Sequence, residues 1–349
     1  MTALWARLCR FNREFRAQHE YSGMKYVAIV VLILLIIGVS AYTATRPSAD
    51  VQDHQSSVVA DGDTGAKPTP LTAALSQEIQ AALKATQWPT LEPSMESVIT
   101  GPSLPPEVTD CGGAQFPDAL ACTWGPFTAK THIVLVADSV GLTYAAPLRE
   151  IALNSGGQIQ VHTEAMRGCS FIDDRIATTD KSLLDACPAR KNHVIDVINH
   201  WNPDVLIISQ SYGARTIAGS NQNVTTGLWS KSMLKIAETI RNRVKKFVFL
   251  SPPPAGIEIS ECYPAKAPAD CVSQVPKLWR SMAVTELEIA KSLNGLWIDS
   301  RQWFCNNGKR CPSFVGSIPT KRDTVFMAPP YGEKIYPAIE ESLRAAGVF

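Results

Sequence analysis

The sequence predicts an α/β fold in which a parallel sheet is covered by helices on both faces. Short, almost continuous apolar runs alternate with longer stretches of helical periodicity, and strands buried on both faces read in this way. The 349 residues are enough for one or two full hydrophobic cores. Strands are expected at residues 133–137, 159–163, 205–209, 247–250 and 296–299.

Helices are expected between these strands and at both ends of the domain. Leu75, Ile79 and Leu83 recur at a spacing of four, which predicts a short amphipathic helix ending before Trp88. From there to about Gly125 the chain is rich in proline, and we expect it to wrap the domain. The later helices are expected near residues 143–154, 190–201, 231–245, 275–293 and 333–346.

An apolar segment near the N-terminus predicts one transmembrane helix. Residues 26–42 contain no charge and number 17, just long enough to span a hydrocarbon core. Residues 1–25 carry five basic and two acidic side chains, so the positive-inside rule keeps them in the cytoplasm. A cleaved signal peptide is the alternative. We therefore expect residues 43–70 to form a flexible stalk and residues 71–349 an extracytoplasmic domain.

The cysteine positions support export independently. Cys9 precedes the apolar segment, whereas eight cysteines follow it, as disulfides in an oxidising compartment require. Pairing of successive cysteines closes only short loops and is the simplest expectation, although eight cysteines allow other connectivities. A zinc site would need closer cysteine pairs. The expected pairs are Cys111 with Cys122, Cys169 with Cys187, Cys262 with Cys271, and Cys305 with Cys311.

Composition excludes several functions. The formal net charge of +1 offers no attraction to a phosphate backbone, so nucleic acid is not an expected partner. The sequence has neither a P-loop nor a Gly-x-Gly-x-x-Gly motif, and we expect no cofactor and no metal. Six histidines, of which His200 is the last, restrict any mechanism that uses an imidazole.

Ser139 follows the first expected strand in the run IVLVADSVG. In a parallel sheet this position faces the ligand crevice, and the backbone N–H of the serine could stabilise an oxyanion. A helix N-cap is the alternative role for such a serine.

Taken together, these segments resemble the SGNH hydrolase superfamily, and specifically the SGNH domain fused to acyltransferase-3 membrane proteins. The resemblance runs from about Leu71 to the C-terminus. It rests on Trp88-Pro89, the Cys111 and Cys122 loop, Ala137-Asp138-Ser139, Gly168-Cys169, Pro203-Asp204, Pro252 to Pro254, Trp303 to Pro312, and Arg322-Asp323. It implies a three-layer α/β/α sandwich with a mainly parallel five-stranded sheet, preceded here by one transmembrane helix.

The resemblance also implies site residues. Ser139 would be the nucleophile, Asp323 would orient the base, and the backbone N–H groups of Ser139 and Gly168 would bind the oxyanion. The third donor would map to Gln210 or Ser211.

The expected base is missing from the C-terminal block. The family has Asp-x-x-His, and here Phe326 occupies the histidine position. A strand histidine, His162, or a Ser-Lys arrangement using Lys321 or Lys334 could substitute chemically. Without a base, a serine hydroxyl is a weak nucleophile.

The sequence therefore predicts a bacterial, single-pass membrane protein with its N-terminus inside, acting in cell-envelope glycan O-acylation as a catalytically degenerate member. An envelope polysaccharide, an acyl donor and an acyltransferase-3 membrane protein are the expected partners. The alternatives are an active O-acyltransferase or esterase with an unorthodox base, and a scaffold for protein contacts. Trp229 and Trp303 could stack on sugar rings, or pack in the core.

Overall fold

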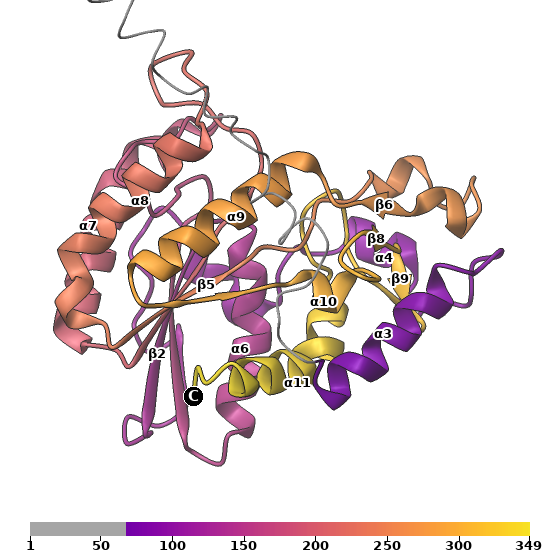
Figure 1. Ribbon diagram of the computed structural model, residues 1–349, viewed down its shortest axis with the longest axis horizontal. Coiled ribbons are helices and arrows are strands. Elements are labelled where there is room, and N and C mark those ends of the chain that lie inside the picture. Colours follow the sequence, from indigo (N-terminus) through magenta and orange to yellow (C-terminus); the bar gives the residue numbers. More distant parts are fainter. Residues whose placement is uncertain (1–67) are drawn as a thin grey trace, which may run out of the picture. The chain divides into compact units, whose positions relative to one another are not determined.

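The computed structural model describes residues 68–349, which contain a six-stranded sheet with helices on both faces (Figure 1). Its strand order is β1-β3-β2-β4-β5-β7. All five expected strands are present and parallel to their neighbours. They are β2 (Thr131–Ala137), β3 (Ile159–Ala165), β4 (Val205–Ser209), β5 (Lys246–Leu250) and β7 (Leu296–Ile298).

The expectation of five strands is wrong by one. β1 (Thr123–Trp124) adds an antiparallel edge, pairing Thr123 with His162 of β3. A strand of two residues is too short to show the alternation by which strands are recognised in a sequence.

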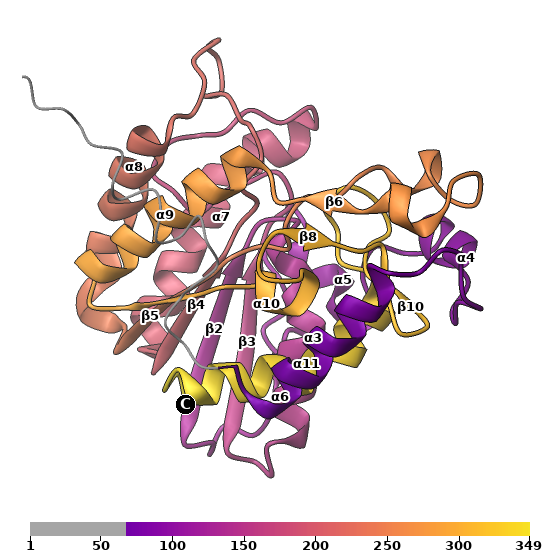
Figure 2. The ribbon, with the colours of Figure 1, turned by 45° about the vertical axis from the view of Figure 1, so that its right-hand side comes forward.

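Three layers are visible in Figures 1 and 2. Helices α7 (Lys181–Trp201), α8 (Thr226–Ile240) and α9 (Lys277–Ser292) cover one face of the sheet. Helices α6 (Ala145–Asn154) and α11 (Pro329–Ala345) cover the other. The three-layer α/β/α architecture is thus confirmed, and every residue of β4, at the centre of the sheet, is buried.

Three helices begin earlier than the sequence predicts: α7, α8, and α11, which starts at Pro329. α7 starts at Lys181 because the Asp180 carboxylate accepts hydrogen bonds from the N–H groups of Ser182 and Leu183. Its first half contains Pro188, a residue that argues against a helix interior in a sequence. α8 starts at Thr226, after the N-cap Thr225.

A smaller lobe lies beyond one edge of the sheet (Figure 2). α3 (Pro70–Ala82) is the expected amphipathic helix; it buries Leu75 and Ile79 and lies against α10, α11 and β9. The lobe's remaining elements are short: α4 (Met95–Thr100), β6 (Ser273–Gln274), α10 (Arg301–Phe304), β8 (Arg310–Cys311), β9 (Phe314–Val315) and β10 (Ile318–Pro319). The short helix α5 (Pro106–Thr109) instead lies against α6.

Four disulfides join successive cysteines, as expected. They are Cys111–Cys122, Cys169–Cys187, Cys262–Cys271 and Cys305–Cys311. Each closes a short loop, and the second ties the segment after β3 to α7.

The expected transmembrane helix at residues 26–42 lies outside the described residues, as do the cytoplasmic segment, nearly all of the stalk, and Cys9. Within residues 68–349 no helix is both long and apolar enough to cross a membrane.

Candidate active site

The candidate site lies where the strand order reverses. β2, the first of the parallel strands, is flanked by β3 on one side and β4 on the other. In open parallel sheets a crevice forms at such a point, outside the carboxyl ends of the strands. Ser139 follows the end of β2 and Gln210 follows the end of β4, so the topology brings the two predicted residues to one crevice.

The Asp138 carboxylate shapes the turn that carries Ser139. Its Oδ1 accepts hydrogen bonds from the N–H groups of Val140 and Gly141, at 2.9 and 3.1 Å. Its Oδ2 accepts from the Ser211 N–H and from the Arg215 guanidinium, at 2.9 and 2.5 Å. Asp138 is almost fully buried, and it thereby links the turn after β2 to the loop after β4.

Gly141 is required at this turn. A Cβ atom there would lie 1.9 Å from the backbone oxygen of Ser209, at the end of β4. The glycine lets the turn approach the neighbouring strand closely enough for Asp138 to reach Ser211.

Two expected oxyanion donors are free. Among the described residues, neither the N–H nor the hydroxyl of half-buried Ser139 has a hydrogen-bond partner, and the N–H of Gly168 has none. Gly168 has a φ of +68°, and a Cβ atom on it would lie 2.9 Å from the Thr178 hydroxyl. The loop therefore depends on glycine at this position, next to the Cys169–Cys187 disulfide.

Gln210 is fully buried, and only the oxygen of its side-chain amide has a hydrogen-bond partner. Its Oε1 accepts a hydrogen bond from the N–H of Phe171 at 2.6 Å, which ties it to the loop of Gly168. Its Nε2 is buried without a partner among the described residues. An amide donor that is already desolvated gains from a ligand oxygen, so the geometry is compatible with the expected third donor. That role stays a prediction.

The C-terminal block adopts a turn closed by Asp323. Its carboxylate Oδ1 accepts hydrogen bonds from the N–H groups of Val325 and Phe326, at 2.9 and 2.8 Å. The half-buried Phe326 side chain offers no proton acceptor. The carboxylate that the resemblance assigns to orienting a base therefore caps a backbone turn.

His162 was considered as a substitute base, and its contacts leave it no freedom for that role. The side chain is buried, with Nδ1 2.8 Å from the Thr123 hydroxyl and Nε2 3.1 Å from the Glu164 carboxylate. Trp201 packs beside the ring, with 4.4 Å between centroids. His162 is a structural histidine.

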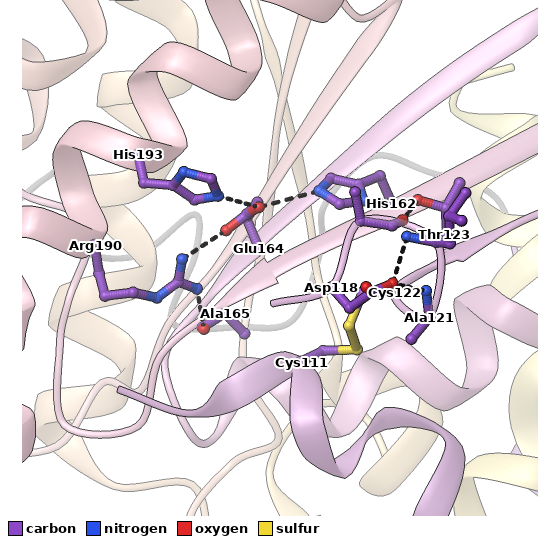
Figure 3. A network of polar contacts seen from close by, with 12 residues as sticks. Cys111, Asp118, Ala121, Cys122, Thr123, His162, Glu164, Ala165, Arg190 and His193 are labelled. Atoms are coloured by element: carbon purple, nitrogen blue, oxygen red, sulfur yellow. Dashed lines mark hydrogen bonds and ion pairs between the residues drawn. A yellow bond between two sulfur atoms is a disulfide. The ribbon is translucent and has the colours of Figure 1, made fainter. Parts of the chain in front are cut away.

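Glu164 is the centre of a buried polar cluster (Figure 3). Its carboxylate contacts His162, Arg190 and His193, the last two at 3.0 and 3.2 Å. Burial alone would raise the pKa of this carboxyl, but the hydrogen bond from His162 and the neighbouring positive charges lower the pKa below its usual value. Phe116, on the Cys111–Cys122 loop, stacks on the His193 ring.

Lys321 is the lysine whose environment suits proton transfer. It is buried, its ammonium donates a hydrogen bond to the carbonyl of Pro254, and it lines a small hollow together with Asp323. Burial lowers the pKa of Lys321 to about 7, against the opposing charge of Asp323. Lys334, the other lysine considered, forms an ion pair with Glu78 of α3 at 2.8 Å.

Another buried acid, Glu286, contacts the loop after β4 and is not among the residues that the sequence predicts for the site. Tyr212 donates a hydrogen bond from its hydroxyl to Glu286 at 2.7 Å. Burial raises the pKa of Glu286 to about 8, and hydrogen bonds and the Arg215 charge only partly counter it. Glu286 lies on the buried face of α9. A carboxylate among the apolar residues of that face was the one sign in the sequence that it is buried.

Both tryptophans considered for sugar stacking are core residues. Trp229 and Trp303 are fully buried. Arg215 lies over the Trp229 ring, 5.2 Å from its centroid, so this indole supports the ion pair at Asp138. Within residues 68–349 no cluster of histidine, cysteine and carboxylate side chains could hold a metal ion.

A mainly parallel sheet with a free serine and two unpartnered N–H donors at its switch point is the arrangement expected of an SGNH domain. The family model described as "SGNH domain (fused to AT3 domains)" matches residues 110–325, and the chain belongs to this family.

Two solved structures indicate how far the likeness extends. The periplasmic domain of a lipopolysaccharide acetyltransferase from Salmonella ser. Paratyphi A has a TM-score of 0.50 and 14% identity, covering 79% of this chain and 97% of that one. An acetylxylan esterase from Geobacillus stearothermophilus has a TM-score of 0.38 and 14% identity, covering 63% and 95%. At 14% identity the likeness to the Salmonella domain is one of fold alone. No curated protein matches the sequence.

Proposed function

We propose that the SGNH domain is displayed outside the bacterial cytoplasm by a single N-terminal transmembrane helix and takes part in O-acylation of an envelope glycan. The uncharged segment 26–42 and the basic residues before it support the anchor and its orientation. Four disulfides in residues 68–349 support an oxidising compartment. The similar Salmonella domain is periplasmic and belongs to an acetyltransferase.

Within this role the domain binds an ester or its glycan carrier and turns it over slowly or not at all. One observation carries this proposal: the Asp323 carboxylate accepts the N–H of Phe326, at the position where the family has its base. Ser139 keeps a free hydroxyl and free oxyanion donors, so the crevice retains the means to hold an ester carbonyl. An acyltransferase-3 membrane protein is the partner that would supply or accept the acyl group.

An active enzyme is the second candidate, and Lys321 is the observation that favours it. A lysine with a pKa near 7 is partly neutral at physiological pH and can accept a proton. Its Nζ is engaged by the Pro254 carbonyl, so this role requires that contact to open when substrate binds.

The test is hydrolysis of p-nitrophenyl acetate by the full chain, beside Ser139→Ala, Phe326→His and Phe326→Leu. We expect the wild type to match Ser139→Ala, and Phe326→His to gain at least about 10²-fold, the lower end of what a general base contributes. Phe326→Leu is the matched control and should gain nothing. Wild-type activity that vanishes in Ser139→Ala would refute the proposal that the domain is catalytically degenerate. If that activity is also lost in Lys321→Met, Lys321 is the base.

If the wild type is inert, calorimetry with an O-acetylated oligosaccharide separates the remaining roles. Binding that Gly168→Val abolishes supports the glycan-acylation role, because the Gly168 loop borders the crevice. Absence of binding supports the scaffold for protein contacts.

A further inference from the structure

An apolar cavity lies between the serine turn and the C-terminal block. It is bounded by Val140, next to Ser139, by Ser211, whose N–H contacts Asp138, and by Val325, next to Phe326. The cavity therefore adjoins both segments that form the candidate active site.

The remaining walls are apolar. They come from the loop after β5, which contributes Pro252, Pro253 and Ala255, and from the start of α9, which contributes Leu278 and Trp279. The indole N–H of Trp279 donates to the Pro252 carbonyl, and the Tyr212 hydroxyl donates to Glu286, so both polar groups are already engaged. A sugar ring placed here would leave several hydroxyl groups without partners, at a free-energy cost for each.

The cavity is larger than an acetyl group requires. Its volume is about 120 Å³. An apolar cavity of about 150 Å³ holds benzene, with six carbons, so roughly four or five carbon atoms fit here. An acetyl group would place a single methyl group in it and leave much of the apolar wall uncovered.

The mouth of the cavity is apolar as well. Leu278 is 39% exposed, one of few large apolar side chains in residues 68–349 that face solvent to this degree. An exposed apolar side chain at the mouth of an apolar cavity is typical of a binding site for an apolar group.

We propose that this cavity binds the aliphatic chain of an acyl group longer than acetyl, up to about four or five carbons beyond the carbonyl. The ester carbonyl would then lie at the N–H groups of Ser139 and Gly168, with the chain between Val140 and Val325. The assignment rests on the proposed function, since it assumes that the crevice holds an ester.

The test uses the full chain in lipid nanodiscs, with labelled methyl groups on leucine and valine followed by NMR. Methyl acetate, methyl butyrate and methyl pentanoate are titrated separately. We expect the resonances of Val140, Leu278 and Val325 to shift, with affinity tightening about fourfold for each added methylene. Equal affinities for the three esters, or shifts confined to other residues, would overturn the assignment.

Ala255→Leu fills the cavity and should abolish the gain from acetate to pentanoate. Ala74→Leu, on an exposed position of α3, is the matched control and should retain it. Leu278→Trp fills the cavity from its exposed side and gives a second variant if Ala255→Leu does not fold. A gain that survives a folded filling variant contradicts the proposal.

Two further arms separate this inference from the function beneath it. In the first arm, methyl β-D-glucoside is titrated. If it shifts these resonances and the esters do not, the cavity is a saccharide subsite, which overturns the acyl assignment but is consistent with a glycan role. In the second arm, Phe326→His could gain hydrolysis of p-nitrophenyl acetate while the esters show no preference for longer acyl chains. That result would support the proposed function and refute the cavity's role. If no resonance shifts with any ligand and Phe326→His gains no hydrolysis, both the cavity's role and the proposed function are refuted.

Discussion

The Arg215 guanidinium lies 2.5 Å from the carboxylate of Asp138, the residue that precedes the candidate nucleophile. The two residues are 77 positions apart, and both side chains are largely buried. The pair joins the loop after β4 to the turn that presents Ser139, so the position of the serine depends on it.

Replacing Arg215 by glutamine should leave the Asp138 carboxylate buried without its charged partner. We expect a loss of about 3–5 kcal/mol in the free energy of unfolding, measured by urea denaturation. Lys235→Gln is the control, because its ion pair with Asp173 is exposed to solvent and should contribute little to stability. Equal effects of the two substitutions would show that the Asp138 pair is not a structural link.

Glu164→Gln should destabilise the fold in a pH-dependent manner. At pH 7 it leaves Arg190 buried without its carboxylate, at a cost of about 3–5 kcal/mol. The folded pKa of Glu164 is lowered, so its stabilisation is fully present above the unfolded value of 4.5 and is lost as pH falls through the folded pKa. The difference in stability between Glu164→Gln and the wild type should therefore narrow below pH 4.5. A gap in thermal unfolding temperature that stays constant down to pH 3 would contradict this.

Lys321 should make the protein more stable as pH rises from 7 to 9. Its folded pKa is lowered to about 7 from 10.5, so in this range the unfolded chain binds more protons than the folded one. The gain should be on the order of 2 kcal/mol, from two pH units at about 1.4 kcal/mol each. Lys321→Met should flatten this part of the stability profile, whereas Lys84→Met, at an exposed position, should leave it unchanged. A flat wild-type profile would refute the expected pKa.

Two glycine substitutions should have opposite effects. Gly141→Ala places a methyl group 1.9 Å from the Ser209 backbone oxygen, so the serine turn must move, and we expect a loss of at least about 2 kcal/mol. Gly227→Ala, on the exposed first turn of α8, meets no atom within 4 Å and should gain about 0.5–1 kcal/mol. Thermal unfolding of both variants gives the comparison. A neutral Gly141→Ala would mean that the turn is not constrained by β4.

The sequence by itself determined the five parallel strands of the sheet, because most of them are buried on both faces and read as almost continuous apolar runs; β3, with Gln160 and His162, is the least apolar. The sequence also predicted the four disulfides that the structure shows, since pairing of successive cysteines closes short loops and needs no knowledge of the fold. Ser139 could be placed in the crevice because the carboxyl ends of parallel strands face a common edge. The missing base was visible in the residue type at Phe326.

Only the tertiary structure decided how these residues are held. The Asp138–Arg215 pair, the contacts of Glu164 with Arg190 and His193, and the burial of Lys321 all join segments that lie far apart in the chain. Their charges look like ordinary surface charges in the sequence, because burial and partner are properties of packing. The apolar cavity is likewise formed by five separate segments, and none of them shows by itself that it lines a cavity.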